Sequence, residues 1–295
     1  MSAVAPDGGQ DRARRETRRG ARGGGEGGAD VRIVADLGHS HRWTLHRGEL
    51  PGGRRVFVKR GADFASEAAG LRWLGEAGAV AVPEVIEAAG DRLVLEWIEP
   101  AAPTDEAAER FGRDLARMHR AGADSFGAPW PGWIAELPMD NAPAGDWPTF
   151  YAERRLLPFV RLARDRGLLS DDDVRTLESV ISILPEISGP PESPSRIHGD
   201  LWSGNVLWSK DRGAVLIDPA AHGGHRETDL AMLALFGAPR LSRIMAAYRE
   251  EAPPADGWRE RVPLHQLHPL LVHVCLFGET YRSSLLEAAT RTLAL

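Results

Sequence analysis

The sequence is short of cysteine, of lysine and of long apolar runs. Its single cysteine, Cys275, cannot form an internal disulfide, and no apolar stretch approaches the roughly 20 residues that a membrane-spanning helix needs. We therefore expect a cytoplasmic protein without a leader peptide, a disulfide framework or a membrane partner. The hydrophobic content of 43% and the charged content of 26% are typical of a globular chain.

Arginine replaces lysine almost everywhere, and it is densest at the N-terminus. Residues 1–29 carry six arginines in a glycine-rich stretch with almost no apolar side chain to bury. We expect this segment to be a disordered tail. Asp11 and Glu16 interrupt the arginine run and no aromatic side chain lies within it, so we expect no nucleic-acid partner.

Residues 30–99 have the pattern of a small sheet with one helix. A turn signal at residues 50–53 separates residues 42–45 from residues 55–59, which alternate with period two, so a hairpin is predicted. Further strands are predicted over 83–86 and 92–98, and apolar residues at helical spacing predict a helix over 64–77.

Residues 100–295 have a mainly helical pattern, interrupted by a loop rich in Trp and Pro over 126–147 and a connector over 189–195. Helices are predicted over 104–122, 150–166, 171–184, 228–236, 241–250, 263–277 and 279–293. A small sheet followed by many helices predicts an α+β fold with a smaller lobe (30–99) and a larger helical lobe (100–295).

The residues that carry chemistry lie in one short segment, residues 197–219. Two short apolar runs flank Asp211 and Arg212, which predicts a hairpin with these two residues at its tip. In that register Asn205 faces Asp218, and opposed Cβ atoms lie about 4.5–5.5 Å apart. The hairpin therefore predicts an amide and a carboxylate in one place.

Such oxygen ligands suit Mg²⁺, which completes its shell with phosphate and water. Asp200 precedes Asn205 on a glycine-containing loop, where a carboxylate can orient a hydroxyl group and accept its proton. A base beside two metal-holding groups is the arrangement of phosphoryl transfer. Taken singly, Asp200 is more safely read as a turn carboxylate and Asn205 as a left-handed residue beside Gly204, so the prediction depends on the set.

Two upstream features fit the same chemistry. Lys59 ends a predicted strand and Glu67 lies at the start of the next helix, which is the order of the ion pair that positions ATP phosphates in kinases. A surface lysine and a solvated glutamate are the common alternative. Glu96, Trp97 and Ile98 follow an apolar strand, and there a connector between lobes is expected to offer backbone groups to adenine.

The run His-Gly-Asp-Leu-Trp-Ser-Gly-Asn at residues 198–205, with residues 217–220 and 224–232, resembles the fructosamine kinase (ketosamine 3-kinase) family, within the aminoglycoside-phosphotransferase-like kinases. The resemblance runs from about Val31 to Ser284. It implies a protein-kinase-like two-lobed fold and ATP-dependent phosphorylation of a sugar hydroxyl. The typical acceptor is O3 of a ketosamine, the product of glycation of an amine, so the implied role is protein deglycation repair.

The resemblance also implies roles for single residues. Asp200 is the implied base, and Asn205 and Asp218 are the implied Mg²⁺ ligands. Trp202 would stack on the sugar, since an aromatic face is a usual platform for a sugar ring or an ammonium group, although core packing is the plain alternative. We expect His198 and His225 on the substrate side. A metal site is disfavoured for His225, because no HExxH pattern and no cysteine ligand accompanies it.

One segment departs from the family pattern. The phosphate-covering loop of the family usually begins with paired glycines, whereas Gly38, His39 and Ser40 stand here. We still expect the backbone amides of this loop to bind phosphate. Asp229, at a predicted helix start, is expected to brace the structure through backbone hydrogen bonds.

Two alternatives stay open at this point. One is an aminoglycoside, choline or homoserine kinase of the same fold, and the other is a non-catalytic nucleotide-binding regulator, which the altered loop at Gly38 leaves open. A metallophosphatase is disfavoured because Val206 rather than a histidine follows Asn205. Neither GxxxxGK[ST] nor GxSxG occurs, which excludes P-loop kinases and α/β-hydrolases. We expect a monomer or a weak dimer.

Overall fold

The computed structural model describes residues 28–295, so the tail predicted over 1–29 lies outside the described residues except for its last two positions. At Ala29 the chain already contacts the smaller lobe. Its carbonyl oxygen accepts a hydrogen bond from Arg92 (3.1 Å), and its N–H donates to Glu87. Within residues 28–295, no helix is long and apolar enough to cross a membrane.

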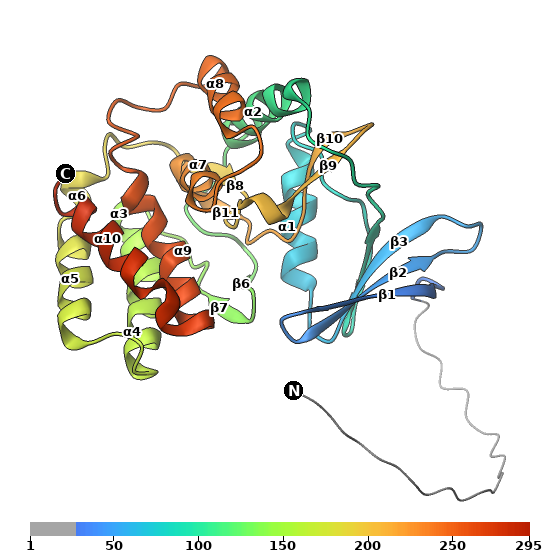
Figure 1. Cartoon of the computed structure of the whole chain (residues 1–295), viewed down its shortest axis with the longest axis horizontal. Helices are drawn as coiled ribbons and strands as arrows, with labels where there is room; N and C mark the ends of the chain where they lie inside the picture. Colours follow the sequence, from blue (N-terminus) through green and yellow to red (C-terminus); the bar gives the residue numbers. More distant parts are fainter. Residues whose placement is uncertain (1–27) are drawn as a thin grey trace, which may run out of the picture.

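A five-stranded antiparallel sheet of order β1-β2-β3-β5-β4 forms most of the smaller lobe (Figure 1). The strands are β1 (Arg32–Ser40), β2 (Trp43–Glu49), β3 (Arg55–Arg60), β4 (Val85–Ala89) and β5 (Arg92–Glu96). The predicted hairpin is confirmed, because Leu45 of β2 is paired with Lys59 of β3. The sequence prediction did not place strand β1, which carries Gly38.

Strand β3 has two different faces because its side chains alternate. Val56 and Val58 are fully buried on one face, so Phe57 and Lys59 point to the other. Helix α1 (Ala65–Glu76) covers that second face with Ala68 and Leu71 and confirms the predicted helix. Lys59 and the start of α1 are thereby brought together.

Helices make up most of the larger lobe, as predicted (Figure 1). They are α2 (Asp105–Arg120), α3 (Trp147–Phe150), α4 (Leu157–Asp165), α5 (Asp171–Ser182), α6 (Leu184–Ile187), α7 (Arg226–Leu235), α8 (Leu241–Glu251), α9 (Val262–Phe277) and α10 (Arg282–Thr292). Local signals set several ends: Thr104 caps α2, and Ser170 with Asp173 forms a capping box on α5. The α+β fold with a small sheet lobe and a large helical lobe is confirmed.

Two features of the larger lobe were not predicted. A short hairpin of β6 (Gly132–Ile134) and β7 (Leu137–Met139) lies inside the Trp- and Pro-rich loop. A wide π-helical turn, η1 (Tyr151–Leu156), interrupts the predicted helix 150–166 between α3 and α4. Such turns are rare, and they often occur at functional sites.

The predicted hairpin of residues 206–217 is present as β9 (Val206–Ser209) and β10 (Gly213–Leu216), but its predicted register is wrong by one residue. Gly213 pairs with Ser209, so the loop holds three residues rather than two. The cause is Gly213 itself, whose φ of +75° suits the left-handed position that closes a three-residue loop. Asn205 is consequently opposite Ile217, whose N–H donates to the Asn205 carbonyl oxygen (3.1 Å).

A second short pair, β8 (Ser195–Ile197) with β11 (His222–Gly224), frames the segment between them. The smaller lobe approaches this segment at Gly70 of α1. A Cβ added to Gly70 would lie 3.1 Å from the Cβ of Ala221 and 3.4 Å from Pro219. The missing side chain therefore lets α1 pack directly beside the residues that follow Asp218.

Candidate active site

A cleft between the two lobes contains two adjoining cavities. One, of about 420 Å³, has apolar walls, and the other, of about 280 Å³, lies next to Asp200. After the ligands expected from the sequence, we call them the nucleotide-side cavity and the acceptor-side cavity. The former volume is in the usual range of ligand sites, and the apolar wall suits a flat aromatic ring. Its apolar lining includes Leu45, Phe57, Leu95, Ile98, Leu207 and Ile217. Both cavities share the lining residues Ser40, Trp43, Lys59, Glu67, Trp202, Asn205 and Asp218.

The structure brings Asp200, Asn205 and Asp218 together despite the shifted register. The amide nitrogen of Asn205 donates to the backbone oxygen (2.9 Å) and to Oδ2 (3.0 Å) of Asp200, and it lies 3.5 Å from the Asp218 carbonyl oxygen. A 3₁₀ turn over Ser203–Asn205 folds the loop back and makes this possible. Asp218 has a φ of +53°, a conformation that a non-glycine residue rarely adopts outside constrained sites.

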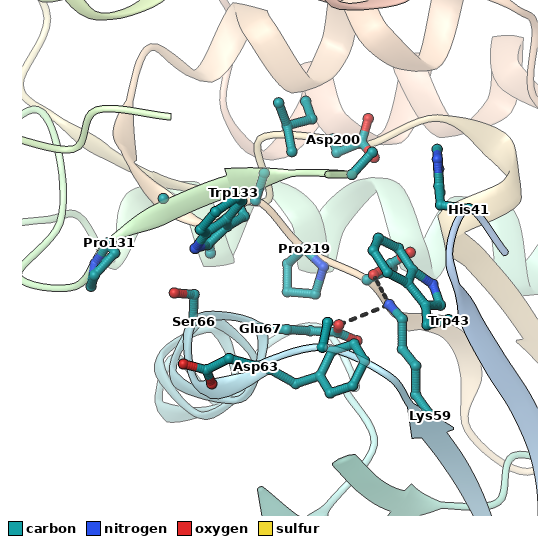
Figure 2. Close-up of a pocket in the computed structure, with 18 of the residues that line it drawn as sticks. His41, Trp43, Lys59, Asp63, Ser66, Glu67, Pro131, Trp133, Asp200 and Pro219 are labelled. Carbon is teal, nitrogen blue, oxygen red and sulfur yellow. Dashed lines mark hydrogen bonds and ion pairs between the residues drawn. The ribbon is translucent and has the colours of Figure 1, made fainter. Parts of the chain in front are cut away.

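Lys59 connects the two lobes by a pair of charged hydrogen bonds. Its Nζ lies 2.8 Å from Glu67 Oε2 and 2.7 Å from Asp218 Oδ1. Figure 2 shows Lys59 pointing toward Glu67. Burial by itself lowers the pKa of an amine, but the charges of Glu67 and Asp218 outweigh it and raise the pKa of Lys59. The predicted pairing of Lys59 with Glu67 is therefore present, and the lysine is charged.

The carboxyl groups of the site differ in their proton affinity. Burial, followed by the negative charge of Asp218, raises the pKa of Asp200 to about 7, and the hydrogen bond from Asn205 offsets only part of this shift. Burial also raises the pKa of Glu67, although Lys59 opposes the change. Burial acts the same way on Asp218, but there Lys59 prevails and the pKa is lowered. Asp200 is thus poised as a base near neutral pH, beside an ionised Asp218.

The donor atoms at this point fit a hard divalent cation. Because the amide nitrogen of Asn205 donates to Asp200, its oxygen Oδ1 is the atom left for another ligand. Lys59 contacts only Oδ1 of Asp218, and the Asp218 side chain is 44% exposed. An amide oxygen and a partly accessible carboxylate are the ligands that Mg²⁺ takes alongside water and phosphate.

His198 is fully buried behind the cleft and lines neither cavity. Its Nδ1 accepts the N–H of Asp200 (3.2 Å), and its Nε2 lies 3.0 Å from the carbonyl oxygen of Ile217. The proton therefore sits on Nε2, which donates to Ile217, and burial lowers the pKa of the imidazole. Contrary to the expected substrate contact, the position of His198 makes it a link between the Asp200 loop and the strand before Asp218.

The expected bracing by Asp229 is visible in its contacts. Its carboxylate accepts the N–H groups of His198 (2.8 Å) and Gly199 (2.9 Å) and contacts His119 Nε2 (3.1 Å). The other ring nitrogen of His119, Nδ1, lies 2.8 Å from the hydroxyl oxygen of Tyr248. No local sequence pattern indicated a role for His119, because its partners are more than 100 positions away along the chain.

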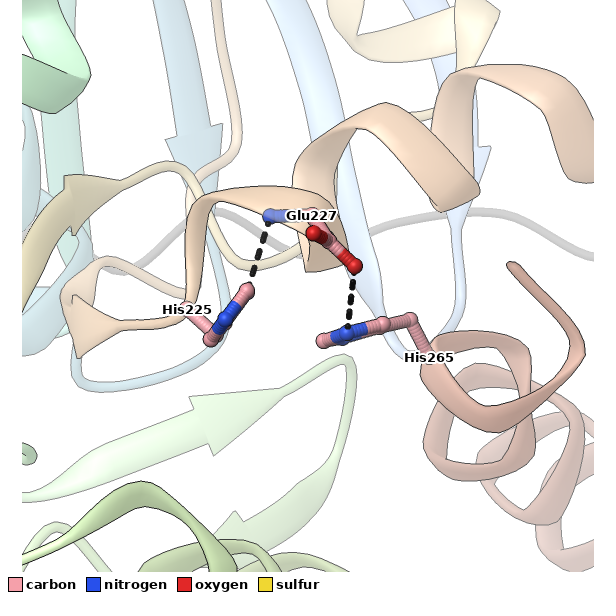
Figure 3. Close-up of side chains that lie close together, drawn as sticks. All are labelled: His225, Glu227 and His265. Carbon is pink, nitrogen blue, oxygen red and sulfur yellow. Dashed lines mark hydrogen bonds and ion pairs between the residues drawn. The ribbon is translucent and has the colours of Figure 1, made fainter. Parts of the chain in front are cut away.

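His225 lies in a buried polar cluster with Glu227 and His265, shown in Figure 3. Their ligand atoms lie within 4.8 Å of one another, as in a metal site. However, Arg261 already holds the Glu227 carboxylate through Nη2 (2.6 Å) and Nε (3.0 Å). A metal ion would add further positive charge beside this guanidinium, so the contacts define a buried ion pair instead.

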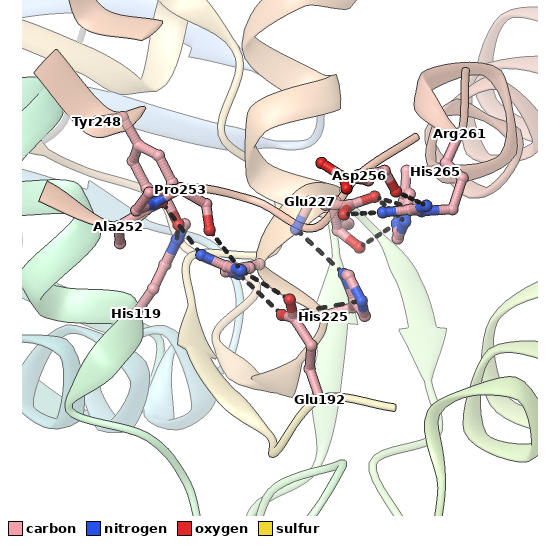
Figure 4. Close-up of polar contacts among 12 residues, drawn as sticks. His119, Glu192, His225, Glu227, Tyr248, Ala252, Pro253, Asp256, Arg261 and His265 are labelled. Carbon is pink, nitrogen blue, oxygen red and sulfur yellow. Dashed lines mark hydrogen bonds and ion pairs between the residues drawn. The ribbon is translucent and has the colours of Figure 1, made fainter. Parts of the chain in front are cut away.

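The ion pair belongs to a larger network that ties α7 to its neighbours (Figure 4). Arg226, next to His225, binds both oxygens of Glu192 (2.7 and 2.8 Å) and the carbonyl oxygen of Ala252 (3.2 Å). Burial lowers the pKa of His225 to about 3, so this histidine is neutral. His225 lines neither cavity of the cleft, and the expected substrate contact is not supported by its position.

The segment expected to cover phosphate is only partly at the cleft. Gly38 and His39 belong to strand β1 and do not line either cavity, whereas Ser40 lines both. The tip of the β1–β2 hairpin is His41-Arg42, and His41 has a φ of +53°. The tip residues, which also line the acceptor-side cavity, were missed because one glycine was not enough to fix where the turn falls.

The connector Glu96, Trp97 and Ile98 lines the nucleotide-side cavity as expected. Within residues 28–295, the N–H of Ile98 has no hydrogen-bond partner, which leaves a donor at the cavity wall. The Glu96 carboxylate is instead bound by Arg212 (2.7 Å), a residue of the β9–β10 loop. Trp202 is 40% exposed and lines both cavities, so it is not a core residue.

A sheet lobe and a helical lobe, with these charged groups in the cleft between them, define a phosphotransferase with the protein-kinase-like fold. The model of the fructosamine kinase family matches residues 43–294 of the chain. This chain belongs to the fructosamine kinase family.

Individual relatives agree with this assignment. A Thermobifida fusca crystal structure that carries a provisional fructosamine-3-kinase name is 56% identical, with a TM-score of 0.87 over 90% of this chain and 95% of that chain. A Thermus thermophilus protein named a probable ketoamine kinase is 36% identical over 83% of this chain and 91% of its own length. The chloroplastic protein-ribulosamine 3-kinase of Arabidopsis thaliana is 34% identical over 76% of this chain and 70% of its own length.

The likeness in fold extends beyond the family. Amicoumacin kinase hAmiN, solved in complex with AMP-PNP, shares the fold with a TM-score of 0.57 at 14% identity, over 89% of this chain and 87% of that chain.

Proposed function

We propose that this protein transfers the γ-phosphoryl group of ATP to O3 of a ketosamine of the fructosamine or ribulosamine type. The observation that carries the proposal is the convergence of Asp200, Asn205 and Asp218 beside Lys59, where the two cavities meet. The ketoamine kinase and ribulosamine 3-kinase names of its relatives support the acceptor class. A non-catalytic regulator would have no need to preserve this convergence.

The nucleotide-side cavity supports the choice of donor. Its apolar walls and the free N–H of Ile98 suit an adenine ring, and Lys59 stands where phosphate oxygens would meet a cation. Amicoumacin kinase binds an ATP analogue in the same fold. We therefore propose that phosphate contacts Ser40 and the tip of the β1–β2 hairpin, rather than Gly38 and His39.

The chemistry assigned to the chain is limited to positioning and proton transfer. Asp200 orients the acceptor hydroxyl group and takes its proton, for which a pKa of about 7 is well matched to neutral pH. Asn205 holds the Asp200 carboxylate in place. Mg²⁺, held by Asn205 Oδ1 and the Asp218 carboxylate, would neutralise charge on the transferred phosphoryl group.

Several consequences of the proposal are predictions that the contacts do not address. A role in protein deglycation repair, a cytoplasmic location and a monomeric or weakly dimeric state follow from the expected activity and from the composition. ATP and a free or protein-borne ketosamine are the expected partners. Neither a nucleic acid nor a membrane is expected to bind.

The decisive experiment is a panel of acceptors assayed for ATP consumption with and without Mg²⁺. The panel contains fructosyl- and ribulosyl-lysine, their Nα-acetyl forms, an aminoglycoside, choline and homoserine. Turnover of the ketosamines, with NMR of the product locating the phosphate on O3, is expected. Faster turnover of the aminoglycoside, choline or homoserine would contradict the proposed acceptor.

A further inference from the structure

One side of the acceptor-side cavity is formed by residues 130–135 together with Asn141, which we call the acceptor wall. Figure 2 shows Pro131 and Trp133 of this wall across from Asp63 and Ser66, at the start of α1. None of its residues lines the nucleotide-side cavity. The acceptor wall is therefore specific to the half of the cleft that receives the phosphoryl acceptor.

Asn141 holds the acceptor wall together through its side-chain amide and its backbone. Its Nδ2 donates to the carbonyl oxygen of Trp130 (3.3 Å), and its backbone carbonyl oxygen accepts the N–H of Ala128 (3.0 Å). The chain packs closely around it. A Cβ on Gly132 would lie only 2.9 Å from Asn141 Nδ2, and one on Gly127 would lie 2.4 Å from the Asn141 carbonyl oxygen.

Arg155 fixes the other end of that amide group from inside the lobe. Its Nη2 donates to Asn141 Oδ1 (2.7 Å), and its Nη1 donates to the carbonyl oxygen of Asp140 (2.6 Å). Arg155 projects from the π-helical turn η1, is 2% exposed and lies over the ring of Phe150 at 4.4 Å. The planar guanidinium suits this contact with two neighbouring residues, which a lysine could not reproduce.

The surroundings of Arg155 are unusual for a buried cation. Within residues 28–295 it forms no ion pair with a carboxylate, and its Nε has no partner. Taking a charge out of water is unfavourable unless an opposite charge compensates it. Burial lowers the pKa of Arg155 to about 9. The burial of the Arg155 guanidinium is unfavourable by itself, and its result is that Asp140 and Asn141 are held in place.

We propose that Arg155 and Asn141 form a positioning pair that determines acceptor selectivity by setting the acceptor wall against α1. The inference rests on the proposed function, since the selected acceptors are those of the proposed reaction. Neither residue supplies a reacting group. They act through the position of Trp130 and Trp133, which bound the space between α1 and Asp200.

The experiment separates selectivity from stability with the variant Asn141→Asp. The new carboxylate keeps an oxygen for Arg155 and compensates its charge, but it removes the donor to Trp130. We expect Tm to equal or exceed that of the wild type, KM for the ketosamine to rise about tenfold, and KM for ATP to stay within about twofold. A purely structural role predicts wild-type kinetics for a variant of wild-type stability, and that result would overturn the inference.

Arg155→Gln tests the other partner, with Arg161→Gln as the matched control on the exposed surface of α4. We expect only Arg155→Gln to raise KM for the ketosamine relative to KM for ATP. If Arg155→Gln fails to fold, the Tm and KM values of Asn141→Asp still test the inference. Parallel increases in both KM values would contradict a role confined to the acceptor wall.

A second readout does not depend on turnover. In Asn141→Asp the backbone amides of residues 126–133 should exchange hydrogen faster than in the wild type, while those of residues 197–206 stay unchanged. A wild type that phosphorylates no ketosamine would contradict the proposed function, and this exchange comparison would then decide the inference. Unchanged exchange at residues 126–133, or faster exchange without a change in KM, would overturn it.

Discussion

The two halves of the cleft are built in different ways. The nucleotide side is bounded by paired strands and a connector, with apolar side chains at alternate positions of β2, β3 and β5. The acceptor side is bounded by loops and by the short β6–β7 hairpin, which Asn141 and the buried Arg155 hold in place. Backbone pairing makes the first half insensitive to single side chains, whereas the second depends on a few polar contacts. We therefore expect substitutions on the acceptor side to change selectivity while nucleotide binding persists.

The largest effect is expected from Asp200→Asn. Removing the proposed base should lower kcat by about 10³-fold, because general-base catalysis typically contributes factors of this order. Binding of ATP with Mg²⁺ should change by less than about twofold, since a lost base affects chemistry more than ground-state binding. Steady-state kinetics and calorimetric titration measure the two quantities. Wild-type turnover by this variant would show that Asp200 is not the base. It would also contradict the expected difference between the two halves of the cleft.

Lys59→Met should impair both halves, because Lys59 lines both cavities and joins Glu67 to Asp218. We expect kcat to fall about 10²-fold and the free energy of unfolding to fall by about 3 kcal/mol, since one partner of a buried ion pair is lost.

Lys210→Met is the natural control for this prediction, because Lys210 is exposed and is the chain's other lysine. It should behave as the wild type in thermal unfolding and in steady-state assays. Equal effects of the two substitutions would show that the buried lysine has no special role.

The pH dependence of turnover should reflect Asp200. Since the proposed base must be deprotonated to act, and burial raises the pKa of Asp200 to about 7, kcat/KM for the ketosamine should rise as pH increases through about 7. Glu67 lines both cavities and burial raises its pKa to about 7 as well, so we expect nucleotide affinity to change over the same interval too. A rate profile that is flat between pH 6 and 8 would contradict the assignment.

The same shift has a consequence for stability. The pKa of Asp200 in the folded protein is above the value of about 3.9 for an unfolded chain. Its contribution to stability is therefore fully present below about pH 4 and is lost as pH rises through about 7. Glu67 shifts in the same direction, so Asp200→Asn should remove only part of the fall in Tm between about pH 4 and 7.

The smallest effect is expected from changes at the N-terminus. The scarcity of apolar side chains in residues 1–27 predicts that their deletion changes Tm by less than about 1 °C. Deletion through Ala29 should lower Tm slightly more, because it removes the contacts with Glu87 and Arg92. A large fall on deleting residues 1–27 would show that the tail packs against the lobes.

Much of the site was predictable because its signals are local. The period-two pattern of β3 put Lys59 on one face, and helical spacing placed Glu67 one turn into the next element. The loop holding Asp200 and Asn205 is a contiguous motif, and Asp229 at a helix start was expected to brace it. These predictions needed only the alternation of strands, the period of a helix and short-range sequence.

The predictions that went wrong concern positions set by distant contacts or by one torsion angle. The positive φ of Gly213 added a residue to the β9–β10 loop and moved the register, and the 3₁₀ turn before Val206 restored the convergence by another route. His198 and His225 carry groups that suit a substrate equally well, and their substrate contacts stay predictions; the structure buries both side chains, and neither lines a cavity of the cleft.

The sequence by itself determined the fold class, the order of strands and helices, and the identity of the chemical groups. It did so because helix and strand periods, caps and the catalytic motif are each encoded within a few consecutive residues. Only the tertiary structure decided which polar side chains face the cleft and which support it, such as Arg155 against Asn141. Those outcomes depend on burial and on partners far apart in the chain, which no local pattern contains.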